Sequence, residues 1–220
     1  MKRTLFCFFI LSLIPTYLFS AGKRISINDL QVNSRDPKLE YVGKGIAEMI
    51  AVELVKSRSV SLIEREKRTK LLEESEFALS DLADPDSQVE LGRMLAADFM
   101  VFGNLIDMDK QLLISMKMVS IETGEVVWAE KLMESLVNYE YISGYFAGSI
   151  LRSMDAEVAS TTEDKVEVKE AKSEEVVLAF SKAIDYYDKK DTERARKELS
   201  RAKRIDPKAE AVQVYIRRLT

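Results

Sequence analysis

The side chains that most often do chemistry in proteins are scarce in this chain. It has no histidine, so the commonest general base and metal ligand is missing. Its one cysteine, Cys7, lies in an apolar run near the N-terminus, so no thiol is expected in the mature protein. We therefore expect no catalytic residue, no cofactor and no bound metal, and we predict that the chain is not an enzyme.

Two short motifs resemble ligand sites. Gly43-Lys44-Gly45 lacks the third glycine of the dinucleotide fingerprint and the Gly-Lys-Ser/Thr ending of a phosphate loop. Because it lies within an amphipathic helical pattern, we favour close helix packing over phosphate binding. Asp107 and Asp109 suggest calcium, yet the glycine and terminal glutamate of an EF-hand loop do not follow, so a solvated hairpin turn is predicted.

Arg65 stands where a short apolar segment ends and a charged helix begins. An arginine guanidinium suits bidentate pairing with carboxylates, so we predict a structural ion pair there, with contact to a partner protein as the alternative.

Contact with other proteins is the remaining kind of chemistry, and aromatic and arginine side chains are enriched at the centres of interfaces. Core packing is the alternative for the aromatic residues, and a solvated helix face is the alternative for the basic run near the C-terminus. The candidate partner-binding residues are Trp128, Tyr141, Tyr145, Tyr186, Arg194 and Arg201.

The N-terminus predicts export. Lys2 and Arg3 precede an apolar run that is too short to span a bilayer, and small residues follow at Ser20, Ala21 and Gly22. We predict a signal peptide over residues 1–21, cleaved after Ser20 or Ala21, with an uncleaved membrane anchor as the alternative. The expected location is the periplasm, with peripheral association with the outer membrane left open.

The mature chain is expected to be acidic. Removal of the leader would lower the net charge from −4 to −6, and an acidic chain is not expected to bind nucleic acid.

Alternating and helical patterns organise residues 22–158 into one domain. Short connections at 107–111 and 122–125 require antiparallel hairpins. We predict an α/β (α+β) fold, with a mixed sheet of about five strands covered by helices. The expected strands are 25–32, 59–63, 98–106, 112–121 and 126–132, and the expected helices are 38–56, 64–75, 87–95 and 138–158.

A charged linker is predicted over residues 159–175, and a helical module over residues 176–220. The module has a break at Asp191-Thr192, alanines where helices would touch and a closing Pro207, which is typical of a tetratricopeptide (TPR-like) helical hairpin; an ordinary helical hairpin is the alternative. One repeat cannot bury its own apolar face, so we expect it to dock onto the main domain or a partner.

Several stretches of the main domain occur in a recognisable order. They are a first strand ending at Asp29, followed by Tyr41–Ile50, Val60–Arg65, Leu71–Glu74, Leu91–Asp98, Val101–Gly103 and Val119–Trp128. In order and spacing they resemble the CsgG-like (curli production assembly/transport component) family, which is related to penicillin-binding-protein activators and flagellar outer-membrane-associated proteins. Channel-forming members carry membrane-inserting hairpins and a lipidated cysteine, and this chain has neither in the corresponding places.

These observations, with the resemblance, predict an exported, non-enzymatic assembly or scaffolding protein of the cell envelope. It would act by protein–protein interaction with itself and other envelope components, and would have no small-molecule substrate. The alternatives are a subunit of an outer-membrane secretion complex of the curli type, and an enzyme acting on a phosphate-bearing ligand at Gly43–Gly45.

Overall fold

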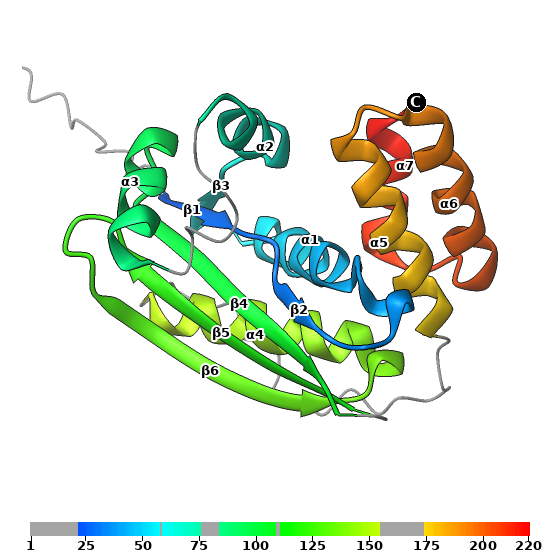
Figure 1. Ribbon diagram of the computed structural model, residues 1–220, viewed down its shortest axis with the longest axis horizontal. Helices are drawn as coiled ribbons and strands as arrows, with labels where there is room; N and C mark the ends of the chain where they lie inside the picture. Colours follow the sequence, from blue (N-terminus) through cyan, green and yellow to red (C-terminus); the bar gives the residue numbers. More distant parts are fainter. Residues whose placement is uncertain (1–21, 58, 76–83, 109–110, 155–173) are drawn as a thin grey trace, which may run out of the picture.

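The computed structural model describes residues 22–57, 59–75, 84–108, 111–154 and 174–220 (Figure 1). The predicted signal peptide and almost all of the predicted linker lie outside these residues, and so does Asp109. No helix in the described ranges combines the length and the apolar character needed to cross a membrane.

A mixed sheet forms the centre of the molecule, which confirms the predicted fold class. Its strands lie in the order β3-β1-β4-β5-β6, and β2 also pairs with β4. The first three of these are parallel to one another, whereas β4, β5 and β6 form the antiparallel meander that the short connections predicted. The strands are β1 Lys23–Ile27, β2 Gln31–Asn33, β3 Val60–Leu62, β4 Phe99–Asp107, β5 Leu112–Ser120 and β6 Val126–Glu134.

Helices cover the two faces of the sheet unequally. Alternate residues of β4 enter different cores: Val101 packs with helices α1 and α4, while Met100 and Phe102 pack with α2 and α3. In Figure 1, α4 runs behind the length of the meander, but α2 and α3 gather at one end of the other face. These helices are α1 Val42–Val55, α2 Arg65–Glu74, α3 Pro85–Leu95 and α4 Tyr139–Ser153.

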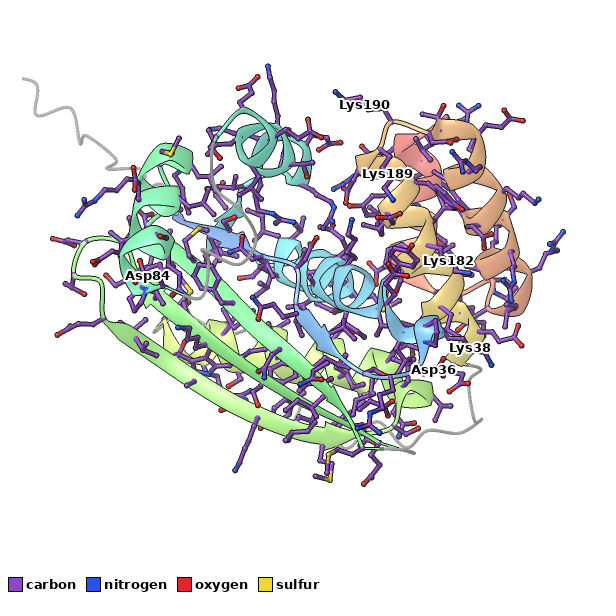
Figure 2. All side chains as sticks on the ribbon, viewed as in Figure 1. Asp36, Lys38, Asp84, Lys182, Lys189 and Lys190 are labelled. Atoms are coloured by element: carbon purple, nitrogen blue, oxygen red, sulfur yellow. The ribbon has the colours of Figure 1, made fainter. Side chains whose placement is uncertain are left out.

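Aspartate side chains fix where several helical segments begin. Asp84 accepts a hydrogen bond from the backbone nitrogen of Ser87 (3.0 Å) at the start of α3, with Pro85 in the first turn. Asp36 does the same for the nitrogen of Lys38 (2.9 Å) in the short 3-10 turn before α1. Figure 2 shows these two caps at opposite ends of the molecule.

The C-terminal part forms three helices, α5 Glu174–Asp188, α6 Thr192–Ile205 and α7 Glu210–Arg218. The predicted helical hairpin and its break before Thr192 are present; its repeat character remains a prediction. The C-terminal helices dock onto the main domain, which was one of the two expected alternatives. Phe180 and Tyr215 belong to the same hydrophobic core as α1 and α4. The Tyr139 hydroxyl adds a hydrogen bond to Asp206 (2.6 Å).

Candidate protein-binding surface

A break in the first strand positions the charged side chains of the site. β1 and β2 both pair with β4, and Asn28, Asp29 and Leu30 lie between them. The backbone and side-chain nitrogens of Asn28 both donate to the carbonyl oxygen of Val101, at 2.9 and 3.2 Å. Leu30 turns towards α1, where its nitrogen donates to the carbonyl oxygen of Gly43 (3.3 Å). The break leaves the Asp29 carboxylate within reach of α2.

Arg65 at the start of α2 is the centre of an ion network. Its Nε and Nη2 donate to Asp188 of α5, both at 2.7 Å, and Nη1 and Nη2 donate to Asp29 at 2.7 and 2.9 Å. Nη1 also donates to Glu48 of α1 (3.1 Å). The side chain is only 2% exposed, and three carboxylates share its donors, so the predicted structural ion pairing is confirmed.

Other groups complete this network and tie the C-terminal helices to it. The Tyr215 hydroxyl of α7 donates to Glu48 (2.6 Å), and Lys44 of α1 donates to Asp185 (2.8 Å) and Asp188 (3.0 Å) of α5. Arg68 reaches Asp29 (3.2 Å), and Lys189 reaches Asp185 (2.7 Å). Figure 2 labels Lys182 on α5 and Lys189 directly after the last residue of this helix. The network therefore joins the strand break, α1 and α2 to the C-terminal helices.

The network also controls which groups are charged. Burial alone would raise the pKa of Asp29, but the charges of Arg65 and Arg68 outweigh it, so the pKa lies below its ordinary value. For Asp185, hydrogen bonds from Lys189 and Lys44 likewise outweigh burial and lower the pKa. Burial, followed by the charge of Glu48, raises the pKa of Tyr215, which keeps its hydroxyl a donor.

These shifts predict a dependence of stability on pH. A carboxyl whose pKa is lower in the folded state stabilises the fold above its unfolded pKa, and this contribution is lost as the pH falls through the folded pKa. The free energy of unfolding, measured with urea, should therefore decrease as the pH is lowered below about 4. The Asp29→Asn variant should be less stable near neutral pH and should show a shallower decline in acid. An unchanged slope would contradict the assignment.

Gly43 and Gly45 serve helix packing. A Cβ on Gly43 would overlap the carbonyl group of Leu30, and a Cβ on Gly45 would overlap the Ser181 side chain of α5. Lys44, between them, is bound to Asp185 and Asp188. The phosphate-loop alternative is therefore wrong. Among the residues that the structure describes, no three acidic or thiol side chains are grouped so as to bind a metal.

The uncovered part of the sheet forms an open face. Val127, Ala129, Lys131 and Met133 of β6 are exposed, whereas the alternate residue Trp128 is buried beneath α4. Val127 and Met133 are about half exposed, at 46% and 50%. Among the described residues β6 pairs with β5 alone, so its outer edge is unpaired there. Exposed apolar side chains beside a free strand edge favour association with another protein.

A groove of about 760 Å³ crosses this face. Residues opposite one another in register supply its floor: Asn104 faces Ser115, which faces Lys131, and Lys117 faces Ala129. We use the name open sheet face for Asn104, Ser115, Lys117, Val127, Ala129, Lys131 and Met133. It combines apolar, uncharged polar and cationic groups, as protein interfaces do.

Three of the predicted partner-binding residues, Trp128, Tyr141 and Tyr145, lie close together on the side of β6 that α4 covers. Trp128 is 8% exposed, donates to the Ser149 hydroxyl (3.0 Å) and packs edge-on against Phe146, with the ring centres 6.4 Å apart. Tyr145 also packs against Phe146 (5.4 Å) and contacts Tyr141 (6.0 Å). A hydrogen bond to Glu130, together with burial, raises the pKa of Tyr145 to about 12. Both tyrosines remain partly exposed.

The other three predicted partner-binding residues, Tyr186, Arg194 and Arg201, lie in the C-terminal helices α5 and α6. The Arg194 guanidinium lies 4.8 Å from the ring centre of Tyr186 and pairs with Asp191. Arg201 pairs with Glu175 at 3.2 Å and Glu198 at 3.8 Å. These contacts are within the chain, and a role in partner binding remains a prediction for all six residues.

The open sheet face was not among the sites predicted from the sequence. Ser115 and Lys117 had the alternation of a solvated strand face, which was the available signal, but nothing marked that face as uncovered. Its exposure depends on α2 and α3 gathering at one end of the sheet.

Comparisons with known proteins found a matching family model and several similar solved structures. Residues 43–132 match the family model described as peptidoglycan-synthase activator LpoB, a span that runs from α1 into β6. The C-terminal domain of LpoB from Salmonella enterica is 13% identical with a TM-score of 0.45, over 52% of this chain and 84% of that one. PelC from Paraburkholderia phytofirmans, a dodecamer, is 11% identical with a TM-score of 0.40, over 62% and 90%. No curated protein matches the chain.

The family description bears on two expectations. It supports the activator part of the predicted resemblance, and it gives no support to the curli part. It also names an activator of an enzyme, in agreement with the expectation that the chain is not itself an enzyme.

Proposed function

We propose that this chain is an exported, non-enzymatic protein of the cell envelope that binds and activates a peptidoglycan synthase. The observation that carries the proposal is the match of residues 43–132 to the synthase-activator model. This span contains Arg65 and every residue of the open sheet face except Met133, which follows it directly.

The open sheet face is the proposed contact with the synthase. It offers half-exposed Val127 and Met133 next to the cations Lys117 and Lys131, beside the unpaired edge of β6. Tyr141 and Tyr145 on α4 flank the same strand from the other side and extend the proposed contact, with Trp128 supporting them through Phe146. A surface of this kind binds by burying apolar area within a polar rim.

The predicted signal peptide supports a periplasmic location for this activity, and peripheral association with the outer membrane fits such a location. Self-association remains part of the proposal, and light scattering after size-exclusion chromatography tests it. Export of the curli type is the weaker alternative, because the family description names a synthase activator.

Direct binding tests the proposal. The chain from residue 22 onwards, immobilised, should bind purified peptidoglycan synthases of the same organism in a saturable way in surface plasmon resonance. The variant Lys131→Glu/Met133→Asp should bind at least about tenfold more weakly, since interface residues of this kind contribute on the order of 1–2 kcal/mol each. Lys67→Glu on α2 is the control and should bind like the unmodified chain. Failure to bind any synthase would refute the proposal.

A further inference from the structure

The C-terminal helices carry a basic surface outside the span that matches the synthase-activator model. Along α6, the buried positions Ala195, Leu199 and Ala202 face α5 and α7. Most of the exposed side chains on the rest of the helix are cationic. We call this surface the α6 ridge; its cations are Arg194, Arg196, Lys197, Arg201, Lys203 and Arg204.

Several of these cations are not engaged by carboxylates. Arg194 and Arg201 form ion pairs, and Arg196 donates to the carbonyl oxygen of Leu219 (3.1 Å from Nε). Lys197, Lys203 and Arg204 form no ion pair with any described residue. Glu193 is the one exposed acid among the described residues of α6. A chain of net charge −4 thus concentrates positive charge on one helix.

The shape of the ridge indicates what it fits. At 100° per residue, Lys197 and Arg204 point directly outward from the buried side, and Arg196 with Lys203 and Arg194 with Arg201 occupy the two flanks. None of the large apolar side chains exposed among the described residues lies on α6, so the contact that it can make is electrostatic. A convex row of cations with charges on both flanks complements a flat layer of negative charge better than a narrow acidic segment.

The position of the ridge leaves room for such a layer. α6 packs on α5 and α7. In Figure 1 it is the outermost helix at the right, while α3 lies at the far left and β6 runs along the lower edge. A surface that touches α6 would therefore leave the open sheet face accessible.

We propose that the α6 ridge binds the anionic headgroups of a phospholipid membrane surface. Clustered lysine and arginine side chains on one helix are attracted to phosphate-bearing lipids, and the attraction weakens with added salt. This surface is distinct from the proposed synthase contact, and it would hold the chain at a membrane while the sheet binds its partner.

Vesicle co-sedimentation tests the inference. The chain from residue 22 onwards should sediment with vesicles of equimolar phosphatidylcholine and phosphatidylglycerol, should remain soluble with pure phosphatidylcholine, and should be released by salt. The variant Lys197→Glu/Lys203→Glu/Arg204→Glu should bind these vesicles at least about a hundredfold more weakly, because each cation near an anionic surface contributes roughly 1 kcal/mol. The neutral variant Lys197→Gln/Lys203→Gln/Arg204→Gln should be weakened in the same direction.

A control with the same change in net charge locates the effect. Arg35→Glu/Arg93→Glu/Lys67→Glu alters three exposed cations outside α6 and should retain vesicle binding. Circular dichroism should show that all variants are folded. Equal loss in both triple glutamate variants would overturn the inference, because it would reflect net charge alone. The inference would also be overturned if the unmodified chain did not sediment with the anionic vesicles. Binding to an acidic peptide such as polyglutamate, without binding to the vesicles, would overturn it as well.

Discussion

Replacing Arg65 with methionine is expected to lower the free energy of unfolding by about 3–5 kcal/mol, the usual range when one partner of a buried ion network is removed. Methionine retains much of the apolar stem, but Asp29, Glu48 and Asp188 would lose the guanidinium whose donors they share. Their mutual repulsion would then act on the strand break, on α1 and on α5 together. The loss should therefore be one cooperative destabilisation of the whole fold.

Urea unfolding followed by tryptophan fluorescence measures this effect, because Trp128 is the one tryptophan of the chain and is buried under α4. Lys67→Met on the same helix is the matched control. Lys67 is exposed and forms no ion pair with a described residue, so its replacement should change the free energy by less than about 0.5 kcal/mol. Similar stability of the two variants would show that the network contributes little.

Replacing Gly43 with alanine is expected to destabilise the protein by about 3 kcal/mol, although alanine is the better helix former. The added Cβ would overlap the carbonyl oxygen of Leu30 and lie 2.9 Å from its carbonyl carbon, and backbone cannot move aside as a flexible side chain can. The hydrogen bond from the Leu30 nitrogen to the Gly43 oxygen would be disturbed at the same time. The substitution would thus push α1 away from the strand break.

Gly144→Ala provides the comparison within the same chain. Gly144 is an exposed helical position on α4, and a Cβ there would meet no atom within 4 Å. The same chemical change should therefore stabilise the protein by about 0.5–1 kcal/mol. Thermal unfolding of the two variants should shift in opposite directions, and a shift in the same direction would contradict the packing described for Gly43.

Local patterns were sufficient to predict the meander and most of the helices. The connections before Leu112 and before Val126 are too short for a parallel crossover, so the antiparallel pairing of β4, β5 and β6 followed from chain length alone. The break before Thr192 was visible in the same way. The strand predicted over 25–32 was wrong in one respect, because it is divided at Asn28–Leu30 to bring Leu30 against Gly43.

The site was less accessible to prediction, because its partners are distant in sequence. Arg65 was recognised as an ion-pairing residue, but Asp188 lies 123 positions away from it and Tyr215 lies 167 positions from Glu48. Their convergence depends on how the C-terminal helices dock onto α1. Trp128 similarly could be identified as an aromatic anchor, while its burial depends on α4.

The two proposed surfaces belong to elements that are packed together in one fold. The ion network and the shared core fix α5, and with it the α6 ridge, relative to the sheet. A chain held at a membrane by its C-terminal helices would therefore present the open sheet face in a defined orientation, and contact alone could shift a bound synthase towards its active conformation.

The rate of glycan-strand polymerisation by a purified peptidoglycan synthase, measured with lipid-linked substrate as the chain is titrated in, tests the central claim most directly. We predict that the rate rises and saturates over the concentration range in which the two proteins bind, and that Lys131→Glu/Met133→Asp shifts this range upward while Lys67→Glu does not. Saturating binding with no change in rate, or an equal increase from both variants, would contradict the claim that this chain activates a synthase through its open sheet face.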